Sequence, residues 1–263
     1  MKKIKIYQVD AFADKLFSGN PAAVCILEDW ISEELMQSVS AENNLAETAF
    51  VVPNGDRYDI RWFTPTIEVD LCGHATLAAG YVLLTQFQPE KREISFYSFR
   101  SGELKVFQSG YYYFLDFPTD TLTVVDDMEQ VSGSVNCRTI ELYKGKSDYM
   151  AVVAGEDELR TLSPDMSLIS GLNCRGLIVT APGKSVDFVS RFFAPQSGID
   201  EDPVTGSAHT SLIPLWAEKL GKNEMIAKQL SKRGGQLRCI YKGDRCWIGG
   251  QLKLYLTGDI FLE

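Results

Sequence analysis

Histidine is scarce in this 263-residue chain, and several motifs built on histidine, cysteine or glycine are missing. Only His74 and His209 occur, so a metal site with several histidine ligands is excluded. The six cysteines include no Cys-x-x-Cys pair, which favours reduced thiols in the cytoplasm over a disulfide framework. No Gly-x-Gly-x-x-Gly or Walker-type loop is present, so a nucleotide cofactor has no support. We therefore expect neither a metal nor an organic cofactor.

Long basic runs and long apolar runs are also missing. Lys and Arg number 26 against 35 Asp and Glu, and the resulting net charge of −9 argues against nucleic acid or an anionic membrane surface as a partner. No stretch approaches the roughly 18 apolar residues of a membrane span. Residues 4–12 are interrupted by polar side chains and predict a strand rather than a signal peptide. The expected protein is cytoplasmic and binds a small molecule.

A five-residue pattern occurs twice, about half a chain length apart. Residues 61–65 read Arg-Trp-Phe-Thr-Pro, and residues 191–195 read Arg-Phe-Phe-Ala-Pro. Each copy is followed by a turn of small residues, at 73–75 and 206–208, and the connection is three residues longer in the second copy. The repetition predicts a duplicated architecture. Turn and acidic residues that follow a strand place the junction near residue 120, so the predicted domains span residues 1–120 and 121–263.

Helical periodicity follows both turns. Apolar side chains recur at helical spacing within residues 75–83 and 208–216, so each segment has one apolar helix face. The first helix is lined by small residues, which let strands approach closely and suit a helix surrounded by a curved sheet. Most of the remaining chain is rich in strand-forming residues, and short helices are expected at 32–40, 156–162 and 223–230. The predicted fold class is α+β, with two similar domains that each wrap a curved sheet around a central helix.

Both histidines lie at or just after the two repeated turns. The N-terminus of a helix attracts anions through free backbone N–H groups, and glycine lets the backbone approach a ligand closely. We therefore expect the two turns to face each other across a cleft and to bind a carboxylate. The residues expected to bind it are Gly73, Ala75, Thr205 and Gly206. The structural alternative is two ordinary capped helices, with His74 and His209 serving only the fold.

Two carboxylates and one thiol are the other candidates for chemistry. Asp202 precedes Pro203, which disfavours the helical region for Asp202 and fixes its direction. Glu47 stands at the entry to the apolar run 49–52, and Cys72 directly precedes the first turn. The alternatives are a solvated acidic loop for Asp202, a charge at a strand edge for Glu47, and a buried small apolar residue for Cys72.

These segments resemble the PhzF-like family of phenazine biosynthesis, within the diaminopimelate-epimerase-like fold. The matching blocks run through nearly the whole chain and are Val9–Phe12, Ser18–Ala22, Ala46–Phe50, Arg61–Pro65, Leu71–Thr76 and Gly198–His209. The resemblance implies two pseudo-twofold-related domains, each with a central helix surrounded by strands, an active site in the cleft between them, and a homodimer.

The resemblance also implies roles for four residues. The glutamate that moves the proton in the family falls on Glu47, and the other functional positions fall on His74, Asp202 and Ser207. Epimerases and racemases of this fold use two opposed cysteines. Cys72 matches the first, but residues 204–207 contain no cysteine, which counts against a two-thiol mechanism.

The functional hypothesis is a cofactor-independent isomerase. It would act by general acid–base proton transfer on a small carboxylate, such as a cyclic unsaturated amino acid. One alternative is an amino-acid racemase or epimerase that uses Cys72 with a different partner. The other alternative is a protein that binds a small molecule on the same scaffold without catalysis.

Overall fold

The computed structural model describes residues 2–262, and the chain forms two compact units. Unit 1 contains Met1–Asp116 and Gly249–Glu263, whereas unit 2 contains Phe117–Ile248. The single junction expected near residue 120 assigns the C-terminal segment to the second domain, but this segment belongs to unit 1. The chain therefore crosses between the units twice, once in each direction.

Unit 1 combines a highly curved sheet with two α-helices and one π-helical turn. The bounds of its elements are β1 Lys2–Ala11, β2 Asn20–Ile26, α1 Glu33–Asn43, β3 Glu47–Asn54, β4 Arg57–Phe63, β5 Glu68–Val69, α2 Gly73–Val82, η1 Leu83–Phe87, β6 Glu93–Ser98, β7 Gly102–Ser109, β8 Tyr112–Pro118 and β17 Leu252–Leu262. Ser32 caps α1 by accepting the Leu35 N–H, as the sequence predicts for a helix that begins with two acidic residues.

Unit 2 has a similar order of elements with more short helices. Their bounds are β9 Thr123–Val124, α3 Glu129–Val135, β10 Glu141–Lys144, β11 Asp148–Val152, α4 Glu156–Arg160, α5 Met166–Ser170, β12 Gly176–Pro182, β13 Phe188–Phe193, η2 Pro195–Ser197, α6 His209–Leu220, β14 Glu224–Gln229, β15 Gly235–Tyr241 and β16 Arg245–Gly250. Within residues 2–262, no helix has both the length and the apolar character needed to cross a bilayer.

The two units repeat one sheet topology. In unit 1, β3 pairs in parallel with β2 and antiparallel with β4, β4 pairs in parallel with β6, and β6 pairs antiparallel with β7. In unit 2, β12 makes the same pairs with β11 and β13, β13 pairs with β14, and β14 pairs with β15. Phe63 of the first motif lies opposite Thr48, and Phe193 of the second lies opposite Leu177. The repeated five-residue pattern therefore marks a repeated position in the sheet.

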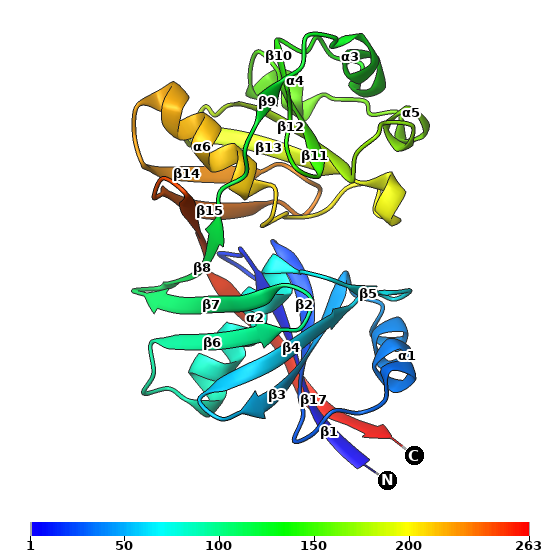
Figure 1. Cartoon of the computed structure of the whole chain (residues 1–263), viewed down its shortest axis with the longest axis vertical. Coiled ribbons are helices and arrows are strands. Elements are labelled where there is room, and N and C mark those ends of the chain that lie inside the picture. Colours follow the sequence, from blue (N-terminus) through cyan, green and yellow to red (C-terminus); the bar gives the residue numbers. More distant parts are fainter. Residues whose placement is uncertain (1, 263) are drawn as a thin grey trace. The chain divides into compact units, whose positions relative to one another are not determined.

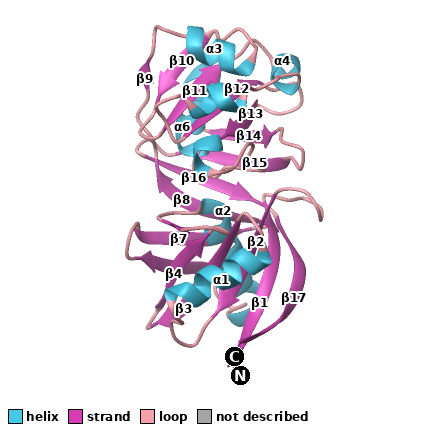
Figure 2. Ribbon diagram, turned by 90° about the vertical axis from the view of Figure 1, so that its right-hand side faces the viewer, coloured by secondary structure: helices cyan, strands magenta, loops and turns pink. Residues whose placement is uncertain are grey.

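The last strand of each repeat is exchanged between the units. β1 of unit 1 pairs antiparallel with β17, which follows the final hairpin of unit 2 along the chain. β10 of unit 2 pairs antiparallel with β9, which follows the final hairpin of unit 1. Figure 2 shows β1 and β17 side by side as a long ribbon of two strands. A strand pattern in the sequence does not reveal which sheet the strand joins, so the sequence alone does not predict the second crossing.

Each unit is built around one buried helix. In unit 1, α2 contacts β1, β2, β3 and β7, and it is buried almost all around (Figure 1). Its small residues permit this close approach: a Cβ on Gly80 would lie 2.5 Å from Val106 Cγ1. In unit 2, the ring of Trp216 in α6 stacks on Phe188 of β13 at 5.6 Å, and its indole N–H donates to Thr180 Oγ1 at 2.9 Å. The prediction of a central helix surrounded by strands is confirmed.

The helix predicted over residues 223–230 is wrong, because this segment is strand β14. Met225, Ala227 and Gln229 are buried, and the residues between them are more exposed, which is the period of two of a strand. Residues such as Glu, Met, Ala, Lys and Gln favour helices in isolation. Pairing with β13 and β15 outweighs that weak preference.

We predict that Gly80→Ala lowers the free energy of unfolding by about 1–3 kcal/mol, the usual effect of overpacking a core. The reason is that Val106 is branched at Cβ and cannot turn its atoms away from the new methyl group. Gly133→Ala in α3 is the matched control, because a Cβ there meets nothing within 4 Å. The control is expected to be neutral or stabilising by up to about 1 kcal/mol. Urea unfolding of both variants measures the difference, and equal stabilities would contradict the packing of α2.

Candidate active site

In unit 1, the first residues of two strands and the first turn of one helix bring polar side chains together. Glu47 is the first residue of β3, Asn20 is the first residue of β2, and His74 is the second residue of α2. β2 and β3 are parallel neighbours, so their first residues lie at the same edge of the sheet. Cys72 directly precedes α2 in an extended conformation. The structure therefore groups two of the predicted site residues, Glu47 and His74, with Cys72.

The imidazole of His74 lies between the carboxylate and the thiol. Its Nε2 is 3.2 Å from Glu47 Oε2, and its Nδ1 is 3.5 Å from Cys72 Sγ. Asn20 Nδ2 is also 3.3 Å from Nδ1. The side chain of His74 is 6% exposed and that of Glu47 is 13% exposed. Glu47 is thus the member of the pair that retains some access to solvent, and His74 is the buried partner behind it.

Burial and charge act in opposite directions on these groups. Burial lowers the pKa of His74, but contact with Cys72 and Glu47 outweighs burial and raises this pKa well above its ordinary value. Burial, helped by the charge of Glu47, raises the pKa of the Cys72 thiol despite the nearby His74.

Among the described residues 2–262, Glu47, Cys72 and His74 form a group whose side-chain atoms could bind a metal ion. Ligand atoms of Glu47, Cys72 and His74 all lie within 4.8 Å of one another. However, Glu47 contacts Nε2 of the ring and Cys72 contacts Nδ1, on the other side of the imidazole. A single ion would bind one ring nitrogen, whereas these two contacts lie on opposite sides of the ring and do not surround one point. This geometry fits the passage of a proton better than the binding of an ion.

The helix N-terminus at Gly73 is formed as predicted. The first intrahelical bond runs from Thr76 N to Cys72 O at 3.1 Å, so the N–H groups of Gly73, His74 and Ala75 have no acceptor within the helix. In unit 2 the helix begins at His209, one residue after the start of the expected helical segment 208–216. Residues 206–208 form a tight turn, with His209 N donating to Gly206 O at 3.0 Å, and α6 starts only at His209.

Asp202 lies in an ordered part of unit 2 rather than in a solvated acidic loop. Its N–H donates to Phe192 O at 3.1 Å, and its Oδ2 accepts a hydrogen bond of 2.5 Å from Thr205 Oγ1. Thr205 and Gly206 are buried, whereas Asp202 and Ser207 are partly exposed. The structure therefore groups Asp202, Thr205 and Ser207 within unit 2.

Arg175 is a candidate that the sequence did not reveal. Its Nη2 donates to Ser207 Oγ at 3.1 Å, and its Nε donates to Asp148 Oδ1 at 2.9 Å. Burial lowers the pKa of Arg175, but the bonds to Asp148 outweigh it, so the guanidinium stays charged. Its side chain is 42% exposed. The structure thus places a cation, paired with Asp148, beside the turn that contains Ser207.

His209 follows the structural alternative. It is fully buried, and its Nδ1 donates to Thr205 O at 2.9 Å. Burial lowers its pKa to about 4, so the ring is neutral. The hydroxyl of Thr76 makes the same contact in unit 1, donating to Cys72 O at 2.6 Å. His209 and Thr76 thus occupy equivalent places in the two repeats and stabilise equivalent turns.

A second contact is repeated in both units. Arg61 Nε donates to Glu68 Oε1 at 2.7 Å, and Arg191 Nε donates to Glu201 Oε1 at 2.7 Å. Each arginine belongs to the repeated pattern, and each glutamate lies in the connection to the following turn. The three extra residues of the second connection fall between the arginine and the glutamate. These ion pairs therefore hold equivalent connections in place and belong to the shared scaffold.

The predicted site residues occupy positions at which the two repeats differ. Strand register and motif position pair Glu47 with Gly176, His74 with Ser207, and Asp202 with Val69. Contacts that serve the fold are kept in both copies, as in the arginine pairs. The predicted site residues are not repeated in this way, and their roles stay predictions.

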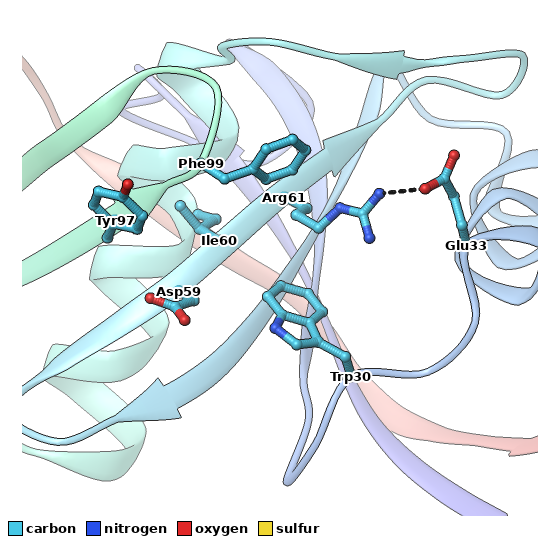
Figure 3. Close-up of a pocket in the computed structure, with 7 residues that line it drawn as sticks. All are labelled: Trp30, Glu33, Asp59, Ile60, Arg61, Tyr97 and Phe99. Carbon is cyan, nitrogen blue, oxygen red and sulfur yellow. Dashed lines mark hydrogen bonds and ion pairs between the residues drawn. The ribbon is translucent and has the colours of Figure 1, made fainter.

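A cavity on unit 1 lies away from Glu47 and His74. It has a volume of about 410 Å³ and is lined by Trp30, Glu33, Asp59, Ile60, Arg61, Tyr97 and Phe99. Figure 3 shows the side chain of Arg61 between those of Phe99 and Trp30 and directed toward Glu33, to which it donates at 2.8 Å. Arg61 already forms ion pairs with Glu33 and Glu68. No predicted site residue lines this cavity.

Comparisons with known proteins match nearly the whole chain to one family. A sequence model of the PhzC-PhzF family, described as phenazine biosynthesis-like protein, matches residues 9–246. An uncharacterized isomerase of Pseudomonas aeruginosa is 45% identical over 263 residues, which is 99% of this chain and 100% of that protein. The crystal structure of a PhzF-family phenazine biosynthesis protein from Enterococcus faecalis has a TM-score of 0.96 at 44% identity, covering 99% of this chain and 100% of the other.

A more distant likeness concerns the fold alone. A hydroxyproline epimerase from Agrobacterium vitis has a TM-score of 0.63 at 10% identity, and the match covers 99% of this chain and 91% of the epimerase. The diaminopimelate-epimerase-like fold class that the sequence suggested is thereby confirmed.

We predict that His209→Gln reduces the loss of stability in mild acid. The folded pKa of about 4 lies below the ordinary 6.5, so between these values the unfolded chain takes up a proton that the folded chain does not. Stability from neutral His209 is therefore complete above pH 6.5 and is lost as the pH falls. From pH 6.5 to 5, the wild type is expected to lose about 1.5 kcal/mol more than the variant.

Urea unfolding at the two pH values measures this difference. His74 has a raised pKa, so its contribution is present below pH 6.5 and is lost as the pH rises through the folded value. Because His74 is present in both proteins, its contribution cancels in the comparison. Parallel losses in wild type and variant would contradict the assigned state of His209.

Proposed function

The chain belongs to the phenazine biosynthesis-like PhzC-PhzF family, and from that premise we propose that it is an isomerase that moves a proton within a small carboxylate substrate without a cofactor. Relatives named as isomerases match this chain from end to end, which supports the reaction class. The substrate class in this proposal is a cyclic unsaturated amino acid, in which a proton and a double bond change places.

The observation that carries the proposal is the contact between Glu47 and His74. A general acid–base must reach the substrate and also exchange its proton with a suitable partner. Glu47 is the more exposed of the two, and His74 is buried at 3.2 Å behind it. We assign to Glu47 the transfer of the proton between two substrate carbons. His74 lies next to this carboxylate and stabilises it.

The remaining predicted residues are assigned to binding. Asp202 accepts a hydrogen bond from a polar group of the substrate, and Ser207 donates one. The N–H groups at the turns that contain Gly73, Ala75, Thr205 and Gly206 suit a carboxylate and the charge that forms when a proton leaves carbon. Arg175, whose charge is paired with Asp148, contacts Ser207 and orients its hydroxyl. The family resemblance also leads us to propose a cytoplasmic homodimer, which sedimentation analysis would test.

The alternative of a racemase that uses Cys72 is disfavoured by the state of the thiol. A cysteine acts as a base or nucleophile in its thiolate form. Burial raises the pKa of Cys72, and the equivalent position in unit 2 is Thr205, which has no acid–base function of that kind. The alternative of a binding protein without catalysis does not explain why Glu47 contacts His74, because binding alone needs no proton transfer.

A direct experiment identifies the substrate. Small cyclic and acyclic amino acids are incubated with the enzyme in D₂O, and enzyme-dependent uptake of deuterium at carbon is followed by NMR. Uptake with migration of a double bond supports the isomerase, whereas loss of optical activity alone supports the racemase. A ligand that raises the melting temperature without any exchange supports the binding protein.

We predict that Glu47→Gln retains near-normal substrate affinity and loses at least about 100-fold in kcat, the low end for a general acid–base. The glutamine keeps the size and some of the hydrogen bonding of Glu47 but cannot carry the proton. Cys72→Ser is the comparison variant, since it changes the other neighbour of His74 and is expected to lose far less. Steady-state kinetics on the substrate found in D₂O measure both. A Glu47→Gln enzyme with most of its kcat, together with an inactive Cys72→Ser enzyme, would establish the thiol mechanism instead.

A further inference from the structure

We propose that Gln229 is a positioning residue of the site, which sets the direction of the Thr205–Asp202 hydrogen bond and so holds Asp202 as a carboxylate that accepts hydrogen bonds. This inference rests on the proposed function only in giving Asp202 a substrate-binding role. Gln229 lies outside the sequence motifs. It is the last residue of strand β14, in a segment for which the sequence predicts a helix.

Three hydrogen bonds fix the amide of Gln229. Its Oε1 accepts the backbone N–H of Thr205 at 2.9 Å. Its Nε2 donates to the backbone carbonyl of Asp202 at 2.8 Å and to Thr205 Oγ1 at 3.1 Å. A backbone N–H can only donate and a backbone carbonyl can only accept, so these partners determine which end of the amide is oxygen. The side chain is buried, with the residue 1% exposed, and cannot exchange these bonds for water.

The orientation of Gln229 in turn determines the orientation of the Thr205 hydroxyl. This hydroxyl accepts a bond from Nε2, and its single hydrogen then points to Asp202 Oδ2 at 2.5 Å. In this arrangement each hydrogen has an acceptor. A bond from a hydroxyl to a charged carboxylate is among the stronger kinds of hydrogen bond. These hydrogen bonds are donated in one direction, from Gln229 to Thr205 and from Thr205 to Asp202, and this direction favours the ionised form of Asp202.

The end of β14 holds this network in position. Gln229 lies opposite Ser190 in β13 and opposite Gly235 in β15, so its backbone is fixed on both sides. Two residues later, Ser231 Oγ donates to Pro203 O at 2.7 Å, directly after Asp202. The strand and the following loop thus bind the segment 202–205 at several points.

Comparison of the two repeats indicates that Gln229 is present because of Asp202 rather than because of the fold. The register of β4 with β6 and of β13 with β14 places Ser98 where unit 2 has Gln229. The position of Asp202 corresponds to Val69. Ser101 Oγ still donates to Asp70 O at 2.5 Å in unit 1, as Ser231 does to Pro203 O. The repeat therefore forms its turn with neither the carboxylate nor the amide, and both differences occur together.

Two variants test the chain of bonds at different points. Gln229→Met removes the amide at similar size, and Thr205→Val removes the hydroxyl while the amide remains. Selective ¹³C labelling of aspartate, assigned with Asp202→Asn, gives the titration midpoint of the Asp202 carboxyl without any need for substrate. We expect Thr205→Val to raise this midpoint by about one pH unit, because it removes the bond to the charged form, worth about 1.5 kcal/mol. Gln229→Met is expected to raise the midpoint by less, because the Thr205 hydroxyl remains but its hydrogen is no longer directed to Asp202 Oδ2. Gln236→Met on the neighbouring strand is the control and is expected to leave the midpoint unchanged.

Kinetics separate positioning from a structural role. Gln229→Met is expected to lower kcat/KM by at least about tenfold in the wild-type background and to have little further effect in the Asp202→Asn background. Circular dichroism and thermal unfolding establish that each variant is folded, and Thr205→Val provides the test if Gln229→Met is not. Unchanged midpoints in the folded variants, or an equal kinetic loss in both backgrounds, would overturn the proposal. Because the titration needs no turnover, it remains decisive even if the isomerase activity is not found.

Discussion

The burial of α2 is the constraint on which the site of unit 1 depends. A helix surrounded by strands must carry small or apolar residues, and α2 is accordingly rich in alanine and glycine. Its second residue is nevertheless His74, whose ring is removed from water along with the helix. A buried imidazole needs polar partners, and the starts of β2 and β3 supply them in Asn20 and Glu47. The packing of the core thereby places a proton-carrying group next to a carboxylate.

Duplication separates what serves the fold from what serves the chemistry. Both repeats keep an arginine–glutamate pair and a side-chain donor to the carbonyl that precedes the helix. With the scaffold maintained by these contacts, the positions between them could diverge. One repeat carries Glu47 and His74, and the other carries Asp202 with its supporting amide. The two repeats thus share one topology but differ at the predicted site.

The sequence was sufficient for the parts of the structure that depend on local pattern. The repeated motif and the helical spacing after it predicted the central helices. The roles of Glu47, His74, Asp202 and Ser207 rest on residue identity in the family blocks and stay predictions. The missing parts depend on pairing between distant segments. Arg175 reaches Ser207 only because β12 begins beside that turn, and Gln229 lies in a strand composed of residues that favour helices.

The exchange of β9 and β17 has a consequence for the order in which the chain folds. During synthesis β9 emerges before the rest of unit 2, so that unit has its edge partner available from the start. Unit 1 is synthesised first, but β1 obtains its partner only when residues 252–262 leave the ribosome. Until then, the whole length of β1 presents an unpaired edge, the kind of surface on which strands of other chains can add. Unit 1 is thus synthesised first but completed last. A truncated chain that lacks β17 would therefore have an incomplete unit 1.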